Sequence, residues 1–270
     1  MSVTTIGTIC VSNDRPFTLF GGVNVLEDRD STLSACEHYV NITTKLGIPY
    51  VFKASFDKAN RSSGTSRRGP GLEAGLKILA EVKSRCGVPV LTDVHESFEV
   101  PDVAAVVDVL QIPAFLCRQT DLLQAAGKSG LPVNIKKGQF MAPEDTRNCV
   151  EKVRMTGNNS VMLTERGSSF GYHNLVVDMR SLVTMRSFGV PVVFDATHSV
   201  QLPGGLGNAS GGQREFVFPL ARAAAAVGID ALFAEVHPRP AEAWSDGPNS
   251  LDFDGISQVL AKVKQIHDLC

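Results

Sequence analysis

Short apolar runs rich in β-branched and aromatic residues recur along the chain at intervals of a few tens of residues. Because each run is almost continuously apolar, it is typical of a strand that is buried on both faces, as in a parallel sheet. The runs that we expect to form strands are residues 17–23, 50–56, 89–94, 109–113, 133–138, 160–166, 191–197 and 231–237.

Segments with the apolar spacing of amphipathic helices lie between these runs, and Gly-x-Pro turns follow several of them. The helical segments are residues 30–46, 71–85, 97–107, 118–128, 145–156, 175–188, 212–227 and 253–269. This regular alternation of strand and helix predicts a single (β/α)₈ TIM barrel over residues 1–270. The alternative is an open doubly wound sheet, but no G-x-G-x-x-G sequence follows a strand to favour dinucleotide binding.

The first residues form an additional element. Residues 4–11 and the apolar run at 17–23 flank a turn-forming sequence at 12–14. We therefore expect residues 1–15 to be a β-hairpin extension that caps the bottom of the barrel, the end at which the strands begin.

The composition limits the possible partners. The formal net charge of −2 argues against nonspecific nucleic-acid binding, which needs a broadly basic face. The six cysteines show no CxxC pair and no zinc-type spacing, as expected for reduced thiols rather than for a disulfide framework. No signal peptide and no membrane-spanning apolar run is recognisable, so we expect a soluble, cytoplasmic protein without a membrane partner.

Polar and charged residues gather where the predicted strands end, which is the end of a barrel that carries chemistry. The densest stretch is residues 53–63, KASFDKANRSS, with three cations after a buried strand. An isolated basic cluster is usually a solvated loop, but here the pattern recurs after later strands. The residues at the strand ends are Asn24, Lys53, Ser55, Lys58, Asn60, Arg61, Asp93, His95, Gln111, Lys136, Lys137, Glu165, Arg166, Asp195, His198, Glu235, His237 and Asp246.

Cations that converge in one barrel mouth need compensating negative charge, because a buried charge is costly unless it is paired. A phosphorylated and carboxylated ligand would supply that charge. Arginine binds carboxylate or phosphate in a bidentate manner, while lysine acts as a movable point charge. The number of cations favours more than one anionic group and is compatible with two substrates.

His198, Glu235 and Asp246 allow three interpretations. They suit a divalent metal site, a proton-transfer network, or a satisfied histidine beside two structural acids. The glycine-rich loop at 203–212 follows His198. Its length and composition predict a mobile lid over the mouth, and a phosphate-binding nest is the alternative.

Several segments together resemble the 3-deoxy-D-manno-octulosonate 8-phosphate synthase (KDO-8-phosphate synthase) family over essentially the whole chain. They are KASFDKANRSS at 53–63, GPGLEAGL at 69–76, TDVHE at 92–96, NIKKGQFMAP at 134–143, RGSSFGYHNLVVDMR at 166–180 and FDATHSVQLPGG at 194–205. The resemblance implies a transferase that condenses phosphoenolpyruvate with D-arabinose 5-phosphate and water, releasing phosphate, in lipopolysaccharide synthesis. The alternatives are heptulosonate 7-phosphate synthesis from erythrose 4-phosphate, and a non-catalytic sugar-phosphate-binding barrel.

The resemblance also implies substrate-binding roles. Around phosphoenolpyruvate it places Lys58, Lys136 and Arg166, with Lys53 and Ser55 nearby. Around arabinose 5-phosphate it places Asn60, Arg61 and Ser62 at the phosphate end, and Asp93 and Gln111 at the hydroxyl groups. Arg118 would reach the same phosphate from a neighbouring subunit, because members of the family are typically homotetramers.

Metal-dependent members of this family combine a first-strand cysteine with a histidine, a glutamate and an aspartate. His198, Glu235 and Asp246 match the last three, but Asn24 occupies the first-strand position. An amide is a far poorer ligand for a soft divalent metal than a thiolate. We therefore expect an enzyme without cofactor, in which Asn24, His198, Glu235 and Asp246 are catalytic. If a metal did bind, the last three would hold it.

Overall fold

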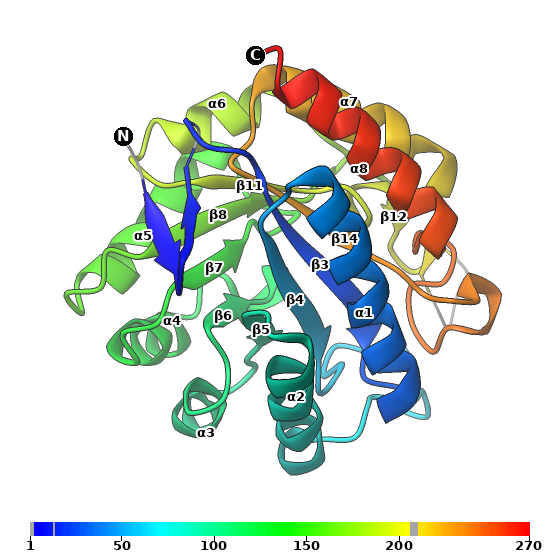
Figure 1. The fold of residues 1–270 in the computed structure, drawn as a ribbon. Coiled ribbons are helices and arrows are strands. Elements are labelled where there is room, and N and C mark those ends of the chain that lie inside the picture. Colours follow the sequence, from blue (N-terminus) through cyan, green and yellow to red (C-terminus); the bar gives the residue numbers. More distant parts are fainter. Residues whose placement is uncertain (1–2, 13, 206–209) are drawn as a thin grey trace.

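The computed structural model describes residues 3–12, 14–205 and 210–270. Eight parallel strands close into a barrel surrounded by helices (Figure 1), as the sequence predicts. In their order around the barrel, the strands are β3 (Thr18–Val25), β4 (Tyr50–Ser55), β5 (Val90–Asp93), β6 (Val109–Ile112), β7 (Val133–Lys136), β8 (Val161–Glu165), β11 (Val192–Asp195) and β14 (Ala231–Glu235).

An α-helix follows each barrel strand along the chain and covers its outer face (Figure 1). The helices are α1 (Arg29–Leu46), α2 (Leu72–Cys86), α3 (Val100–Ala104), α4 (Thr120–Lys128), α5 (Thr146–Arg154), α6 (Arg180–Arg186), α7 (Val217–Val227) and α8 (Phe253–His267). The main apolar core lies between this ring and the strands, which explains why the strands are apolar on both faces.

Helix α1 shows how local sequence sets the boundaries of an element. Asp28 is its N-cap, and the carboxylate accepts hydrogen bonds from the backbone N–H groups of Asp30 and Ser31. Gly47 ends the helix with φ 64°, a left-handed conformation that glycine adopts without a Cβ clash. The chain then turns through Ile48 and enters β4.

Three helices, α3, α6 and α7, are much shorter than the sequence predicts, because part of each expected segment forms other structure. The start of the segment at 97–107 is a 3₁₀ turn, and two other segments begin with short strands that pair antiparallel with preceding ones. These strands are β9 (Ser168–Ser169) with β10 (Leu175–Val176), and β12 (Gln201–Leu202) with β13 (Gly211–Gly212). The 3₁₀ turns are Ser97–Glu99, Ala114–Leu116, Pro143–Asp145, His198–Val200, Arg214–Phe216 and Pro240–Glu242.

An N-terminal hairpin closes the bottom of the barrel, as predicted, but its turn lies elsewhere. Strands β1 (Thr4–Ile6) and β2 (Ile9–Val11) pair with each other, so the reversal occurs at Gly7 and Thr8 and not at 12–14. Gly7 has φ 57°, which favours a turn at this position over one further along. Figure 1 shows the hairpin in dark blue beside β7 and β8.

The hairpin contributes apolar side chains to the interior of the barrel. Ile6 and Val11 pack against inward-facing residues that include Phe20, Met162 and Phe233. This apolar plug fills the lower part of the barrel and leaves the opposite end to polar residues.

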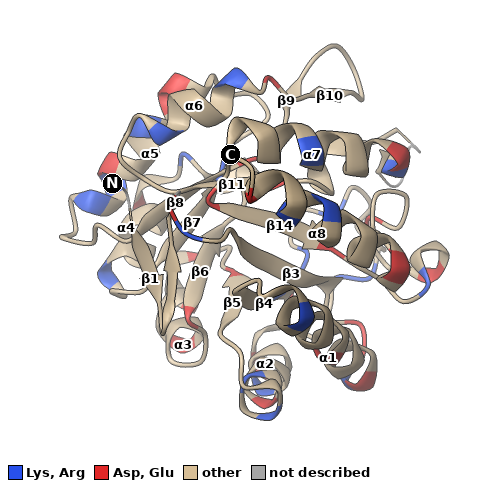
Figure 2. Ribbon diagram, turned by 45° about the horizontal axis from the view of Figure 1, so that its top comes forward, with Lys and Arg blue, Asp and Glu red and all other residues tan. Residues whose placement is uncertain are grey.

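The outer surface has no single dominant charge. Acidic and basic positions both occur along outer helices such as α1 and α2 (Figure 2), in agreement with the small net charge. Within the described part of the chain, no helix has both the length and the apolar character that crossing a membrane requires.

The hairpin plug leads to a stability prediction. Ile6 is 1% exposed, so Ile6→Ala should lower the free energy of unfolding by about 2–5 kcal/mol through lost burial and a cavity. Val3 is 50% exposed, so Val3→Ala serves as the control and should change that free energy by about 0.5 kcal/mol or less. Urea unfolding measures both, and equal effects would contradict the plug.

Candidate functional site

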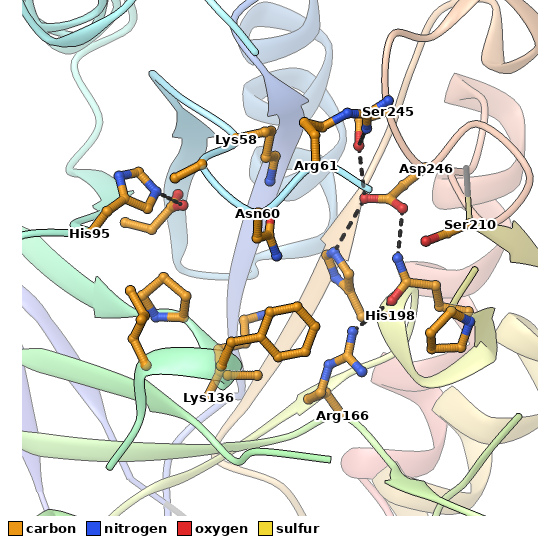
Figure 3. A pocket seen from close by; sticks show the side chains of 18 of the residues that line it. Lys58, Asn60, Arg61, His95, Lys136, Arg166, His198, Ser210, Ser245 and Asp246 are labelled. Atoms are coloured by element: carbon orange, nitrogen blue, oxygen red, sulfur yellow. Dashed lines mark hydrogen bonds and ion pairs between the residues drawn. The ribbon is translucent and has the colours of Figure 1, made fainter. Parts of the chain in front are cut away.

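A cavity of about 340 Å³ opens at the carboxyl ends of the barrel strands. Figure 3 shows side chains from several strand ends pointing into it. The predicted site residues that line it are Lys53, Lys58, Asn60, Arg61, Ser62, Asp93, Gln111, Lys136, Arg166, His198, Glu235 and Asp246. Asn24 and Ser55 are buried directly behind its wall. The structure therefore brings almost all of the predicted residues together.

Asn24 joins two carboxylates of the mouth. Its Nδ2 donates hydrogen bonds to Glu235 Oε2 at 2.8 Å and to Asp246 Oδ2 at 2.6 Å. A register shift between β3 and β4, at residues 22–25, turns Asn24 toward these acids. The backbones are close just before it, since a Cβ on Gly22 would lie 1.9 Å from the Lys53 carbonyl oxygen.

A buried ion pair lies beside Asn24. Lys53 Nζ is 2.6 Å from Glu235 Oε1 and also donates to the Asn24 carbonyl oxygen at 3.2 Å. Burial is the largest single effect and would raise the pKa of Glu235, but the positive charges of Lys53, His198 and Lys58 together outweigh it and bring that pKa to about 2. Glu235 is therefore an anion at neutral pH.

His198 lies between three carboxylates. Its Nδ1 is 2.8 Å from Asp195 Oδ2, and its Nε2 is 3.6 Å from Glu235 Oε2 and 3.9 Å from Asp246 Oδ2. Asp195 is fully buried and also accepts the backbone N–H of His198 at 2.9 Å. This arrangement directs one imidazole nitrogen to Asp195 and the other to the mouth, as expected for proton transfer.

Lys136 extends from β7 to the same Asp195 carboxylate, with which it forms an ion pair. Its ammonium group lies 3.3 Å from the centroid of the Phe233 ring, a cation–π contact. Burial lowers the pKa of Lys136 to about 8, against the opposing effect of Asp195. Its charge is therefore sensitive to nearby anions.

Arg166 is held from one side only. Its Nη2 donates to Gln201 Oε1 at 2.8 Å, and Gln201 Nε2 donates in turn to Asp246 Oδ1 at 2.6 Å (Figure 3). The buried Nη1 of Arg166 has no hydrogen-bond partner among the described residues. Burial lowers the pKa of Arg166, and an anion at Nη1 would both pair and stabilise its charge.

The loop after β4 brings Lys58, Asn60, Arg61 and Ser62 to the rim of the mouth. Arg61 donates to the Ser245 hydroxyl and, at 2.9 Å, to the Trp244 carbonyl oxygen. Within the described residues, no carboxylate lies within 4 Å of the cationic groups of Lys58, Arg61 or Arg166; the ion pairs of the mouth involve other residues. These three cations are thus available to an anionic ligand.

Asp93 lies on the opposite side of the mouth. It accepts a hydrogen bond from Ser55 and lies 3.0 Å from His95 Nε2. Burial would raise the pKa of Asp93, but His95 and Lys58 hold it well below its usual range. For His95 burial acts in the opposite direction and would lower the pKa, but Asp93 raises that pKa above its ordinary value. The pair thus favours a charged acid beside a more basic imidazole.

Asp246 has an uncommon backbone conformation, with φ 54°. A left-handed conformation is rare outside glycine and costs free energy, although aspartate tolerates it better than most residues. The turn is fixed by neighbouring contacts, since Arg214 donates to the Gly247 carbonyl oxygen at 2.6 Å and Asn249 N–H donates to the Asp246 carbonyl oxygen at 3.1 Å. Together these contacts direct the Asp246 carboxylate to Asn24 and Gln201.

Two sequence predictions concern residues outside this cavity. Arg118 is exposed and does not line the mouth of its own chain. Residues 206–209, the centre of the predicted lid at 203–212, lie outside the described residues, so the lid stays a prediction.

Four uncharged polar residues that line the mouth, and the acid Glu96, were absent from the predicted site; the uncharged ones are Gln139, Gln201, Ser210 and Ser245. Uncharged side chains in loops resemble ordinary turn residues in a sequence. Their one signal was position, because Gln139 and Gln201 lie three and six residues after barrel strands.

Comparisons with known proteins give a consistent result. Residues 1–270 match the model of the DAHP synthetase I family. A relative from Aromatoleum aromaticum is 60% identical over 258 residues, covering 95% of this chain and 92% of that protein. Relatives from Dechloromonas aromatica (60% identity; 92% and 90% covered) and Hahella chejuensis (54%; 98% and 94%) are equally extensive. All three are named 2-dehydro-3-deoxyphosphooctonate aldolase.

The lowered pKa of Glu235 predicts how stability responds to acid. A carboxyl group whose pKa falls from 4.5 to about 2 on folding stabilises the folded state above pH 4.5 and loses that contribution as the pH falls toward 2. Glu235→Gln should therefore weaken the decline in unfolding free energy across this window, measured by urea unfolding at several pH values. Glu37→Gln, at an exposed position, should retain the wild-type decline; identical curves for all three proteins would contradict the assignment.

Proposed function

This chain belongs to the DAHP synthetase I family, and from that premise we propose how its mouth condenses phosphoenolpyruvate with D-arabinose 5-phosphate and water. The products are 3-deoxy-D-manno-octulosonate 8-phosphate and inorganic phosphate. The chain is an enzyme of this type, since relatives at 54–60% identity over most of its length carry the corresponding name. That name also favours this reaction over heptulosonate synthesis and over a non-catalytic barrel.

The observation that carries the assignment of roles is the set of three cations without carboxylate partners, Lys58, Arg61 and Arg166. The two substrates bring two phosphates and one carboxylate into the same cavity. Binding them would compensate these cations, which pair with no carboxylate among the described residues. Holding both anions in one site converts a bimolecular encounter into a positioned reaction.

Phosphoenolpyruvate belongs, in this proposal, on the side of Lys136 and Arg166. The unpaired Nη1 of Arg166 offers a donor for its carboxylate or phosphate, and Lys136 adds a movable charge. Lys58 and Lys53 line the same cavity, and Ser55 supports Lys53 from behind the wall.

Arabinose 5-phosphate belongs on the side of Asn60, Arg61 and Ser62. Arg61 would exchange its neutral contacts with Trp244 and Ser245 for a phosphate, which accepts stronger, charge-assisted hydrogen bonds. Asp93 and Gln111 also line the cavity and provide acceptors for the sugar hydroxyl groups.

The chemistry forms one C–C bond and one C–O bond and breaks the C–O bond to phosphate. C3 of phosphoenolpyruvate attacks the open-chain aldehyde, whose oxygen takes up a proton. A water molecule adds to C2, where positive charge develops, and loses a proton; phosphate then leaves from C2 as the new hydroxyl group gives up its proton and becomes the carbonyl group. We assign proton transfer and the positioning of water to His198, Glu235 and Asp246, with Asn24 holding the water or a hydroxyl group.

We propose that this enzyme works without a metal. In the metal-dependent arrangement Glu235, Asp246 and His198 would be ligands, joined by a thiolate at position 24. Here Asn24 places a neutral amide at that position, and its N–H₂ group donates to both carboxylates. A neutral amide is a far poorer ligand for a soft divalent metal than a thiolate, which supports the proposal.

We also propose a homotetramer in which Arg118 acts across a subunit interface. Its exposed position outside the mouth of its own chain is compatible with that role. Large apolar side chains are exposed near the same rim, among them Phe115 (51%) and Phe140 (60%), as expected of a surface that contacts another subunit.

The cytoplasmic location of the enzyme stays a prediction.

Release of inorganic phosphate tests the reaction and the metal proposal together. Phosphate should appear only when both substrates are present, and arabinose 5-phosphate should support faster turnover than erythrose 4-phosphate. Treatment with a chelator should leave the rate unchanged. Loss of activity on chelation with recovery on addition of Mn²⁺ or Zn²⁺ would overturn the metal-independent mechanism without affecting the reaction assignment.

Substitution of Arg61 tests the pentose-phosphate side. Arg61→Ala should raise the KM for arabinose 5-phosphate by about 10- to 100-fold, since a charge-assisted hydrogen-bonding group contributes about 1.5–3 kcal/mol. The control is Arg68→Ala on the same loop, because Arg68 is exposed and pairs with Asp57. An unchanged KM in Arg61→Ala, measured by steady-state kinetics, would remove Arg61 from the site.

A further inference from the structure

A third buried ion pair lies behind the phosphoenolpyruvate side and outside the cavity. Lys137 Nζ is 3.4 Å from Glu165 Oε1, and both side chains are about 1% exposed. Each residue is the sequence neighbour of a proposed substrate-binding cation, Lys136 or Arg166. Because side chains alternate along a strand, the pair points away from the mouth while those two cations point into it.

The contacts of Glu165 concentrate on the turn that carries Arg166. Glu165 Oε1 accepts the backbone N–H groups of Arg166 at 3.0 Å and Gly167 at 2.6 Å. Its other oxygen, Oε2, accepts a hydrogen bond from Ser181 of α6 at 2.6 Å. One carboxylate therefore links the end of β8 to the helix behind it and fixes the backbone of Arg166.

Lys137 holds the same turn from the neighbouring strand. It donates to the Ser168 hydroxyl at 2.8 Å and to the Gly167 carbonyl oxygen at 3.3 Å. Gly167 has φ 91°, so the chain reverses sharply here and does not continue the sheet. The turn thus depends on side-chain contacts rather than on ladder hydrogen bonds.

We infer that the Lys137–Glu165 pair is a positioning device for Arg166 and thereby sets the affinity for phosphoenolpyruvate. Replacing a buried ion pair with apolar residues is often neutral for stability, so stability alone does not account for the pair. Arg166 binds its anion with an otherwise unpartnered donor, Nη1, so its function depends on where the backbone places it. The inference rests on the proposed role of Arg166.

Glu165→Gln provides the direct test. An amide cannot accept both backbone N–H groups with the strength of a carboxylate, so Arg166 should move. A displacement of about 1 Å costs on the order of 10²-fold, so the KM for phosphoenolpyruvate should rise by about 10- to 100-fold. The KM for arabinose 5-phosphate should stay unchanged, because Arg61 lies on a different loop. Equal changes in both KM values, or none, would overturn the inference.

A matched control separates positioning from stability. Asp230 is 2% exposed, accepts the Val192 backbone N–H at 2.7 Å and lies 3.4 Å from Arg186, but at the opposite end of the barrel. Asp230→Asn should lower the midpoint of urea unfolding and leave both KM values unchanged. If it raises the KM for phosphoenolpyruvate as Glu165→Gln does, the effect is general destabilisation and the inference fails.

Two further variants keep the result interpretable. The double variant Lys137→Met with Glu165→Met leaves no lone buried charge; it should unfold at a higher urea concentration than Lys137→Met alone yet retain the raised KM. A wild-type KM in the double variant would overturn the inference. Arg166→Lys tests the proposed function separately. An unchanged KM for phosphoenolpyruvate in Arg166→Lys would remove Arg166 from the site. A raised KM in Arg166→Lys together with a wild-type KM in Glu165→Gln would reject only the positioning role.

Discussion

The ion pair between Lys53 and Glu235 is the contact on which the arrangement of the mouth depends. These residues lie on β4 and β14, which flank β3, and Asn24 of β3 contacts both of them. Two charges withdrawn from water are tolerated only if they pair closely and their remaining hydrogen-bonding capacity is satisfied. The fixed geometry of three adjacent barrel strands meets that condition, and it also fixes the amide that would face the reacting water.

Around this contact the enzyme divides its charges into two groups. Lys53 and Lys136 are paired with buried carboxylates, so they remain compensated in the absence of substrate. Lys58, Arg61 and Arg166 have no such partners among the described residues. The paired cations keep the mouth folded and the unpaired ones make it attractive to anions. The negative charge of the bound substrates would thus compensate the positive charge of these three cations.

The two ends of the barrel have separate tasks. At the lower end, the hairpin and the inward-facing apolar residues form an apolar plug. At the upper end, the strands finish in polar side chains, and these are held by loops whose ladders are short, such as β9 with β10 and β12 with β13. Side-chain contacts stabilise these loops, such as those of Glu165 on the turn of Arg166 and of Arg214 on the turn of Asp246. Function therefore depends on buried polar contacts that lie one layer behind the cavity.

The sequence by itself determined the barrel, its strand ends and most of the mouth. The spacing of apolar residues is a local property of the chain and predicts strands and helices directly. A closed parallel barrel then brings every strand end to one place. The tertiary structure decided the partners of Asn24, the bridge through Gln201 and the support behind Arg166, because these contacts join distant segments. It also moved the hairpin turn to Gly7 and kept Arg118 outside the mouth of its own chain. A pattern along one chain does not encode such distances, since they depend on how the strands close and how loops pack over them.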